Sequence, residues 1–189
     1  MKRSLLALFA LAALATPASA RADVTSWLAL GGGGGVQRHN TDNGNGTVDA
    51  APNFSASLGV GSSPNPPVIV GGVFRALVHF GLGTDISLSM RVASRGFVRG
   101  GFGVAFDVGP AYRFWRKGDY GTYPLQGVLT IGLPIGLQVG LGGHFWSLDN
   151  VNPAVGAFAV VELDLLRLTL MRKDLEQYWP NPSAAGDIK

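Results

Sequence analysis

The sequence has 189 residues, of which 47% are hydrophobic and only 14% are charged, compared with roughly 25% charged residues in a typical soluble domain. Its 15 Lys and Arg residues face 12 Asp and Glu residues, a balance too even to favour a nucleic acid as partner. There is no cysteine, which excludes disulfides and cysteine-ligated metals.

The N-terminal segment has the pattern of an export signal. Lys2 and Arg3 precede an apolar run over residues 5–15, and the sequence Ala-Ser-Ala at residues 18–20 has the small side chains of a cleavage site. The apolar run is too short to span a membrane as a helix, which needs roughly 17–25 residues. We therefore expect residues 1–20 to be a cleaved signal peptide. Without them, 13 basic residues remain against 12 acidic ones, a net charge of +1.

Eight later segments alternate between large apolar residues and small or polar ones, as strands between two different environments do. The pattern is clearest in residues 84–93, where Ile86, Leu88 and Met90 alternate with Asp85 and serines. The first segment is assigned mainly by its position, because the glycines at residues 31–35 erase the pattern. The predicted strands cover residues 24–36, 51–61, 68–80, 84–94, 100–115, 123–133, 135–147 and 154–168.

Turn-forming residues separate the predicted strands, for example at residues 62–67 and 148–153. The longest connection, residues 37–52, is rich in Asn, Asp and Gly, and we expect it to be a surface loop.

The segment at residues 100–115 carries two charges within an otherwise apolar stretch. Phe102, Val104 and Phe106 share one face, whereas Asp107 and Arg113 lie on the other, among glycines and alanines. If the bulky apolar face contacts lipid, the charged face must line an interior. Hydrocarbon does not tolerate an open strand edge, so the sheet must close on itself. The sequence therefore predicts an all-β fold, an eight-stranded antiparallel up-and-down transmembrane β-barrel within residues 21–172, followed by a short C-terminal tail at residues 173–189.

Aromatic residues are expected to gather at the two rims, at the level of lipid headgroups. With both ends of the barrel in the periplasm, Trp27 and Phe97 would lie at the inner rim, and Tyr178 and Trp179 just beyond it. The outer rim would carry Phe80, Phe114, Trp115, Tyr123, Phe145 and Trp146. Strict alternation along residues 135–147 nevertheless puts the Trp146 side chain on the lumen face with His144.

The predicted inward face contains ionisable residues of both signs. A barrel of eight strands has an interior only wide enough for side chains, so these groups are expected to pair and to plug the lumen. A selective pore would instead need rings of one sign. By height alone, Arg75, Asp107 and Glu162 would meet near the middle of the barrel. The predicted lumen network consists of Arg75, His79, Asp85, Arg91, Asp107, Arg113, His144, Glu162 and Asp164.

The signal, strand count, alternation and aromatic rims over residues 24–170 make the chain resemble the small eight-stranded outer-membrane β-barrel proteins, the class that includes the OmpA transmembrane domain. The resemblance implies a location in the outer membrane, contact with its lipid and lipopolysaccharide, and insertion by the barrel assembly machinery. Members usually end their last strand on an aromatic residue. Here residues 163–172, LDLLRLTLMR, are followed by a polar, Pro-containing tail, which departs from that pattern.

Some small barrels hydrolyse lipids with Ser, His and an acid at the rim, and His144, Ser147 and Glu162 are the corresponding residue types here. On a straight strand Ser147 would face away from His144, beyond the hydrogen-bond reach that a nucleophile and its base require. We therefore expect no catalytic residues and no enzymatic activity.

Neither a metal site nor a cofactor site is expected. Residues 41–49 resemble a calcium loop, but Thr41 and Pro52 occupy the positions of the two strongest ligands. The glycines at residues 31–35 are followed by Val36 where a dinucleotide-binding motif needs glycine.

The sequence thus predicts an integral outer-membrane barrel with a structural role or a role in surface recognition, in which the segment at residues 37–52 contacts an extracellular ligand. Two alternatives remain open at this point. One is a hydrolase that modifies lipid A or phospholipid at the barrel rim, and the other is a secreted soluble β-sandwich.

Overall fold

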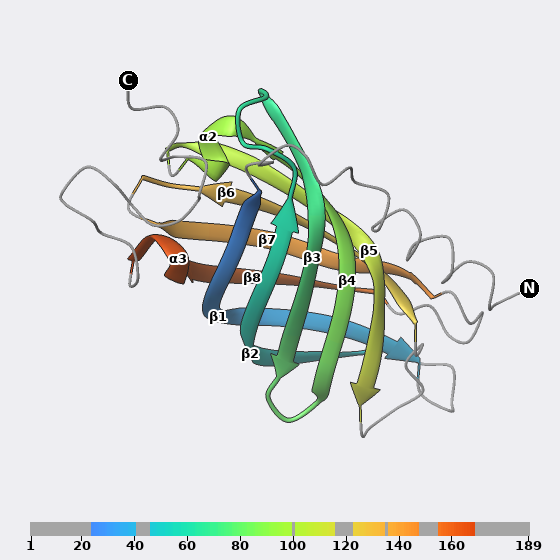
Figure 1. The fold of residues 1–189 in the computed structure, drawn as a ribbon. Coiled ribbons are helices and arrows are strands. Elements are labelled where there is room, and N and C mark those ends of the chain that lie inside the picture. Colours follow the sequence, from blue (N-terminus) through green and yellow to red (C-terminus); the bar gives the residue numbers. More distant parts are fainter. Residues whose placement is uncertain are drawn as a thin grey trace, which may run out of the picture.

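The computed structural model describes residues 24–40, 46–99, 101–115, 123–134, 136–147 and 155–168, and within them the chain forms one closed barrel of eight antiparallel strands (Figure 1). Each strand pairs with the next, and β1 pairs with β8 from Ala29 opposite Asp164 to Arg38 opposite Val155. This all-β up-and-down order confirms the predicted fold class, and closure excludes a β-sandwich. The strands are β1 Thr25–Asn40, β2 Gly46–Gly61, β3 Val68–His79, β4 Gly83–Ser94, β5 Gly103–Trp115, β6 Pro124–Gly132, β7 Leu137–Ser147 and β8 Val155–Asp164.

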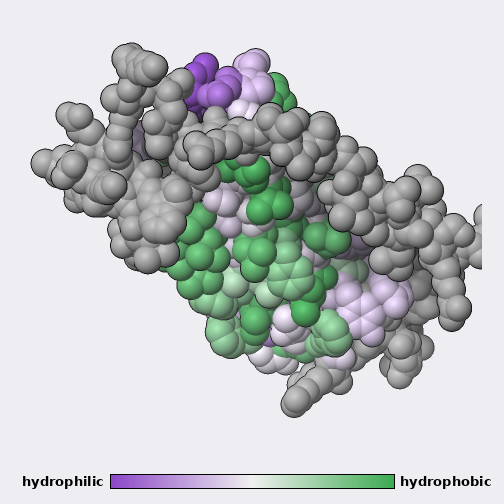
Figure 2. Space-filling model, in the orientation of Figure 1, coloured by the Kyte–Doolittle hydropathy of each residue, from purple (hydrophilic) through white to green (hydrophobic). Residues whose placement is uncertain are grey.

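Most charged residues of the strands lie inside the barrel, and most of their bulky apolar residues lie outside. Leu88 is 66% exposed on the outer wall, whereas Arg75 is 2% and Glu162 0% exposed in the lumen. Figure 2 shows hydrophobic side chains gathered over the outer wall on the side turned to the viewer. Strand alternation accounts for this arrangement, because successive side chains point to opposite faces of the sheet.

The segment at residues 37–52 is not the predicted loop. β1 continues to Asn40 and β2 begins at Gly46, and the two pair up to Asn40 opposite Gly46. Residues 41–45 lie outside the described part of the chain. The prediction was wrong because Asn, Asp and Gly favour turns locally, whereas a cross-strand ladder satisfies the same backbone groups.

The last strand is also shorter than predicted, since it ends at Asp164. The Asp164 carboxylate accepts a hydrogen bond from the Leu166 backbone N–H at 3.1 Å, and the short helix α3 (Leu165–Leu168) follows. An acidic side chain that satisfies a free backbone N–H in this way favours the start of a helix.

The glycine run in β1 lets two strands approach closely. A Cβ atom at Gly31 or Gly33 would collide with the backbone of β8, and one at Gly35 would lie 2.9 Å from the Ala157 carbonyl oxygen. A Cβ at the alternate positions Gly32 and Gly34 would have no atom closer than 3.3 Å. The inward glycines therefore serve the contact that closes the barrel.

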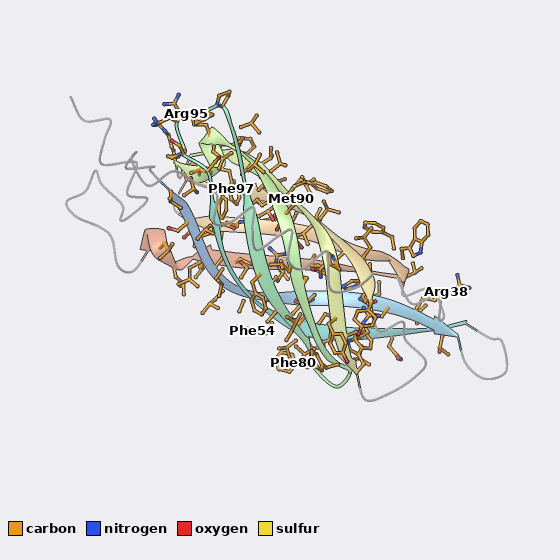
Figure 3. All side chains as sticks on the ribbon, turned by 45° about the vertical axis from the view of Figure 1, so that its right-hand side comes forward. Arg38, Phe54, Phe80, Met90, Arg95 and Phe97 are labelled. Carbon is orange, nitrogen blue, oxygen red and sulfur yellow. The ribbon has the colours of Figure 1, made fainter. Side chains whose placement is uncertain are left out.

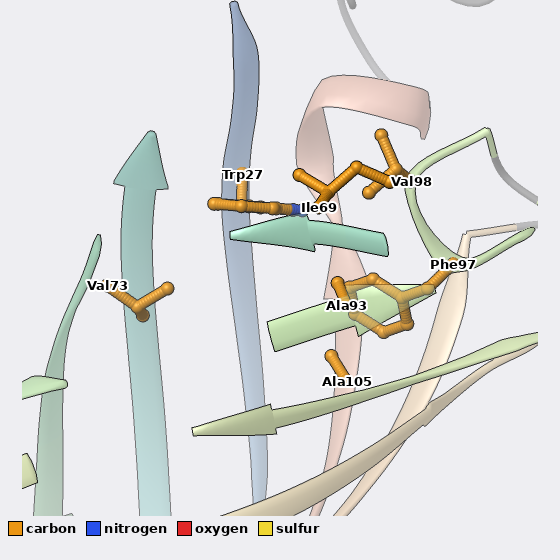
Figure 4. Close-up of a cluster of buried hydrophobic side chains, with 7 residues drawn as sticks. All are labelled: Trp27, Ile69, Val73, Ala93, Phe97, Val98 and Ala105. Atoms are coloured by element: carbon orange, nitrogen blue, oxygen red, sulfur yellow. The ribbon is translucent and has the colours of Figure 1, made fainter. Parts of the chain in front are cut away.

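A helical turn seals one end of the lumen. In α2 (Arg95–Val98), the Ser94 hydroxyl accepts the Phe97 N–H at 3.3 Å, and the Phe97 ring is fully buried. A Cβ at Gly132 would lie 2.8 Å from this ring, so glycine there leaves room for it. The apolar cluster at this end consists of Trp27, Ile69, Val73, Ala93, Phe97, Val98 and Ala105 (Figure 4).

The sequence predicted that Trp27 and Phe97 form an aromatic rim at this end, but both side chains are buried in the cluster and do not form an exposed rim. Ser94 and Gly96 in the β4–β5 connection are typical of a turn, but the connection forms a capped helix that directs Phe97 into the barrel. Figure 3 shows Arg95 and Phe97 at this end and Phe80 at the opposite end, beside the turn between β3 and β4.

The opposite end carries the exposed aromatic residues Phe80, Tyr112, Phe114, Tyr123, Phe145 and Trp146. Two of the outer-rim predictions for this end need comment. Trp115 is only partly exposed, because its indole bonds inward to Asp85. Trp146 is 63% exposed, because a bulge sets Gln126 opposite His144 but Leu125 opposite Trp146, so that Phe145 is an extra residue.

Several predicted features lie outside the described residues: the signal peptide at residues 1–20, the tail at 173–189 with Tyr178 and Trp179, and part of the barrel range 21–172. Among the residues that are described, no helix has both the length and the apolar character needed to cross a membrane.

Replacing Gly33 by Ala should lower the free energy of unfolding by about 3 kcal/mol, because the added Cβ would collide with the backbone of Ala159. Replacing Gly72 by Ala is the matched control, since a Cβ there meets no atom within 4 Å. Urea denaturation of the refolded protein, followed by tryptophan fluorescence, measures both. Equal stability of the two variants would contradict the close approach of β1 and β8.

Candidate functional site

The middle of the lumen contains a buried ion pair between neighbouring strands. Arg91 on β4 and Asp107 on β5 are register partners. The Arg91 Nε atom donates to Asp107 Oδ1 at 2.6 Å and its Nη2 atom to Oδ2 at 2.8 Å. The Arg91 guanidinium also lies 5.1 Å from the centre of the Trp27 ring and 5.5 Å from that of Phe97. The pair thus joins the polar lumen to the apolar seal.

Arg75 extends this pair across the barrel. Its Nη2 atom lies 3.5 Å from Asp107 Oδ2 and 3.6 Å from Glu162 Oε2, on opposite sides of the lumen. The Ser55 hydroxyl donates to the other Glu162 oxygen at 2.6 Å. The structure therefore brings together Arg75, Asp107 and Glu162, the three residues predicted to share one height. We call Arg75, Arg91, Asp107 and Glu162 the central cluster.

A second group surrounds Asp85 nearer the aromatic end. Arg113 donates to both Asp85 oxygens, at 2.9 and 3.0 Å, and the Trp115 indole N–H donates to Oδ1 at 2.7 Å. The Nε2 atoms of His79 and His144 lie 3.5 and 3.3 Å from Asp85 Oδ2. We call these five residues the Asp85 cluster.

Two glutamines complete this cluster and were missed from the sequence. The side chain of Gln37 lies 3.2 Å from His144 Nδ1, and that of Gln126 lies 3.2 Å from His144 Nε2. Strict alternation along residues 123–133 puts Gln126 on the inward face, but the predicted network does not include it. Gln37 was assigned to a loop; had β1 been extended by strict alternation beyond Val36, Gln37 would have fallen on the inward face.

Asp164, the last predicted network residue, belongs to neither cluster. It is buried at the end of β8, where Gln138 donates to Oδ2 at 3.4 Å and the other oxygen accepts the Leu166 N–H. Its contacts are those of a residue that ends a strand and begins a helix.

The charges in the lumen are mixed and close together. Arg75, Arg91 and Arg113 each have a guanidinium nitrogen within 3.6 Å of a carboxylate oxygen. This arrangement differs from the rings of one sign that make a selective pore. Contact between opposite charges offsets their loss of hydration, which would otherwise be prohibitive for an isolated buried charge.

Two of the three residues considered for hydrolysis have buried polar partners in the lumen. Glu162 is held by Ser55 and Arg75, and His144 lies between two glutamines and Asp85. The bulge at Phe145 removes the straight-strand condition under which Ser147 would face away from His144. The Ser147 side chain lies outside the described part of the chain, and nothing is inferred about its position relative to His144.

Metal binding finds no support among the described residues, which contain no group of three or more His, Cys, Asp or Glu side chains suited to hold an ion. The calcium-like segment is split: residues 41–45 are outside the description, and Thr47 and Asp49 form part of the β2 ladder with His39 and Gln37.

Comparison of the chain with models of known protein families, with curated proteins and with solved structures finds no match. The functional conclusion therefore depends on the fold and on the residues described above.

Replacing Asp107 by Ala should lower the free energy of unfolding by about 3–5 kcal/mol, since Arg91 loses both of its hydrogen bonds while it stays buried. Adding Arg91→Met should restore most of the loss, because an apolar pair of similar volume replaces an unpaired charge. Urea titration of the single and double variants gives the two values. A double variant as unstable as Asp107→Ala would contradict the pairing.

Proposed function

We propose that the protein is an integral outer-membrane β-barrel with a plugged lumen, which acts in surface recognition through the segment at residues 37–52. One observation carries the membrane assignment: bulky apolar side chains lie exposed around a closed barrel whose charges are inside. Each strand from β2 to β8 contributes at least one of these exposed apolar side chains. Examples are Leu58, Phe74, Leu88, Met90, Phe106, Leu129, Leu141 and Val161.

Exposure of so many apolar side chains to water would be energetically unfavourable. Soluble monomers rarely expose contiguous apolar patches larger than a few hundred Å², and a water-soluble barrel places its apolar residues inside. Hydrocarbon suits this wall, because a closed ladder leaves no strand edge unsatisfied there. The shortest strand, β6, has 9 residues, which is within the roughly 9–11 needed to cross a bilayer at a tilt.

The exposed aromatic residues support one orientation. Six of them, from Phe80 to Trp146, gather at the end that also carries the long β1–β2 hairpin, whereas Phe102 is exposed at the opposite end, which α2 and the apolar cluster close. Aromatic rings favour the headgroup region, and outer-membrane barrels have their longer connections outside. In this orientation the hairpin faces the exterior, and the wall contacts lipid and lipopolysaccharide after insertion by the barrel assembly machinery.

The lumen supports a role other than transport or catalysis. The central cluster crosses the barrel, and Phe97 and its neighbours fill the end behind it. With the interior filled and the wall in lipid, the β1–β2 hairpin is the largest described element that is free to meet a partner outside the membrane.

Replacing Leu88 by Arg should lower the free energy of unfolding in lipid vesicles by about 2–4 kcal/mol, because Leu88 lies near the middle of β4 and faces outward. The control is Val68→Arg, which is similarly exposed but begins β3 at one end of the wall, and it should cost about 0–1 kcal/mol. Denaturant titrations of both variants in vesicles test the membrane assignment. Equal costs at the two depths would count against it.

The plugged lumen has its own test. The purified protein, reconstituted in a planar lipid bilayer, should produce no stepwise conductance, because the central cluster and the apolar seal block the lumen in series. Regular conductance steps from the unmodified protein would contradict a plugged barrel while leaving the membrane location intact.

A further inference from the structure

The β1–β2 hairpin has one edge that the barrel does not use. The ladder between β2 and β3 ends with Asn53 opposite His79, although β2 extends back to Gly46. β3 stops because the chain reverses after it: Leu82 N–H donates to the His79 carbonyl, and Gly81 has a φ of 85°. The part of β2 before Asn53 therefore projects past its neighbour.

The direction of the backbone groups on this edge follows from one hydrogen bond. The Phe80 N–H donates to the Pro52 carbonyl at 2.9 Å, so Pro52 directs its backbone toward the β3 side. Along a strand, the N–H and C=O groups of alternate residues point to the same side. Val48 and Ala50 therefore point their backbone donors and acceptors away from β1, where no described strand pairs with them.

The exposed Val48 side chain lies on the part of β2 that projects past Phe80. Val48 is 63% exposed and lies four residues beyond Pro52, about 13 Å along the tilted strand from the hydrogen bond between Pro52 and Phe80. Phe80 belongs to the exposed aromatic end, which marks the membrane boundary in the proposed orientation. An apolar side chain and unpaired backbone groups outside the membrane together suit a protein partner.

We propose that residues 46–50 of β2 bind an extended segment of another protein, which adds a strand to this edge. Main-chain hydrogen bonds to Val48 and Ala50 supply the contact, as in other cases of strand addition. Asp49 would lie between these two bonded positions, where facing residues are about 4.5 Å apart. A Lys or Arg opposite Asp49 is therefore favoured in the added strand. The inference rests on the proposed function in one respect, that this end lies outside the membrane.

A second copy of the chain is a poor occupant. Two antiparallel copies of one edge are related by a twofold axis perpendicular to the sheet, and two parallel copies by an axis along the strand. Because the barrel wall stands upright in the membrane and its strands are tilted, neither axis coincides with the membrane normal. Two copies in one membrane, with the same orientation, must be related by an axis along that normal.

The experiment uses the full chain in detergent micelles and three synthetic peptides. The first alternates Thr and Val around a central Lys, the second has Glu in place of Lys, and the third is the Lys peptide with N-methyl groups on alternate amides. Fluorescence anisotropy measures binding. The Lys peptide should bind at least tenfold more tightly than the N-methylated one and severalfold more tightly than the Glu peptide.

The protein variants are Ala50→Pro, which removes the outward N–H, and Ala50→Val, which keeps it. Ala50→Pro should weaken binding of the Lys peptide at least tenfold, and Ala50→Val should leave it within twofold of the unmodified protein. Migration that changes on heating, in semi-native gels, shows that both variants are folded. In hydrogen exchange, the amides of Val48 and Ala50 should exchange fast in the free protein and slowly with the peptide.

Equal binding to the Pro and Val variants, no binding of the Lys peptide at millimolar concentration, or slow exchange of both amides without peptide would overturn the inference. A dimer in micelles that Ala50→Pro abolishes would identify a second copy as the occupant and overturn the choice of partner. Vesicle insertion of the unmodified protein is measured separately. Failure there refutes the proposed function, whereas failure of the peptide experiment alone refutes only the strand addition.

Discussion

Backbone hydrogen bonding between the first and last strands is the constraint on which the rest of the molecule depends. β1 pairs with β8 over the segment that contains the inward glycines Gly31, Gly33 and Gly35. At these positions a side chain would collide with β8. Closure at eight strands leaves an interior that side chains must fill, so long Arg and Gln side chains occupy space that would otherwise hold water. The alternation along each strand decides which face is outward, and here it is the bulky apolar face, the reverse of the arrangement in a water-soluble barrel.

Charges enclosed in this way have to satisfy one another, and the two clusters do so differently. In the central cluster, the Asp107 carboxylate pairs with both Arg91 on β4 and Arg75 on β3. One carboxylate thus pairs with arginines from two strands, next to the apolar cluster that closes the barrel end. In the Asp85 cluster, a single carboxylate accepts a bidentate Arg113 and an indole, with two imidazoles beside it. Both clusters link side chains of different strands across the lumen. Because positive and negative groups are paired, the described part of the lumen has no continuous row of charges of one sign.

The alternation of side chains was sufficient to predict eight strands and to assign which face each one turns inward, because the period of two is set by local geometry. Alternation does not give the register between strands, but the heights of Arg75, Asp107 and Glu162 along their strands were sufficient to predict that these three residues meet. The features that were missed are local departures from alternation. Ser94 caps a helix that redirects Phe97, Asp164 ends β8 early, and the bulge at Phe145 moves Trp146 outward. Gln37 was missed because turn-type residues beyond it hid the continuation of β1.

Strand edges are the reason why we propose recognition at the hairpin and not at the wall. Within hydrocarbon an unpaired N–H or C=O group is prohibitively costly, so the strands there are paired on both sides. Beyond the aromatic end, water can satisfy such groups, and a strand can outlast its neighbour, as β2 does past His79. In the proposed membrane setting, the described strands therefore offer an open backbone edge where the hairpin projects. Pro52, which has no N–H, stands at the point where the paired edge gives way to the open one.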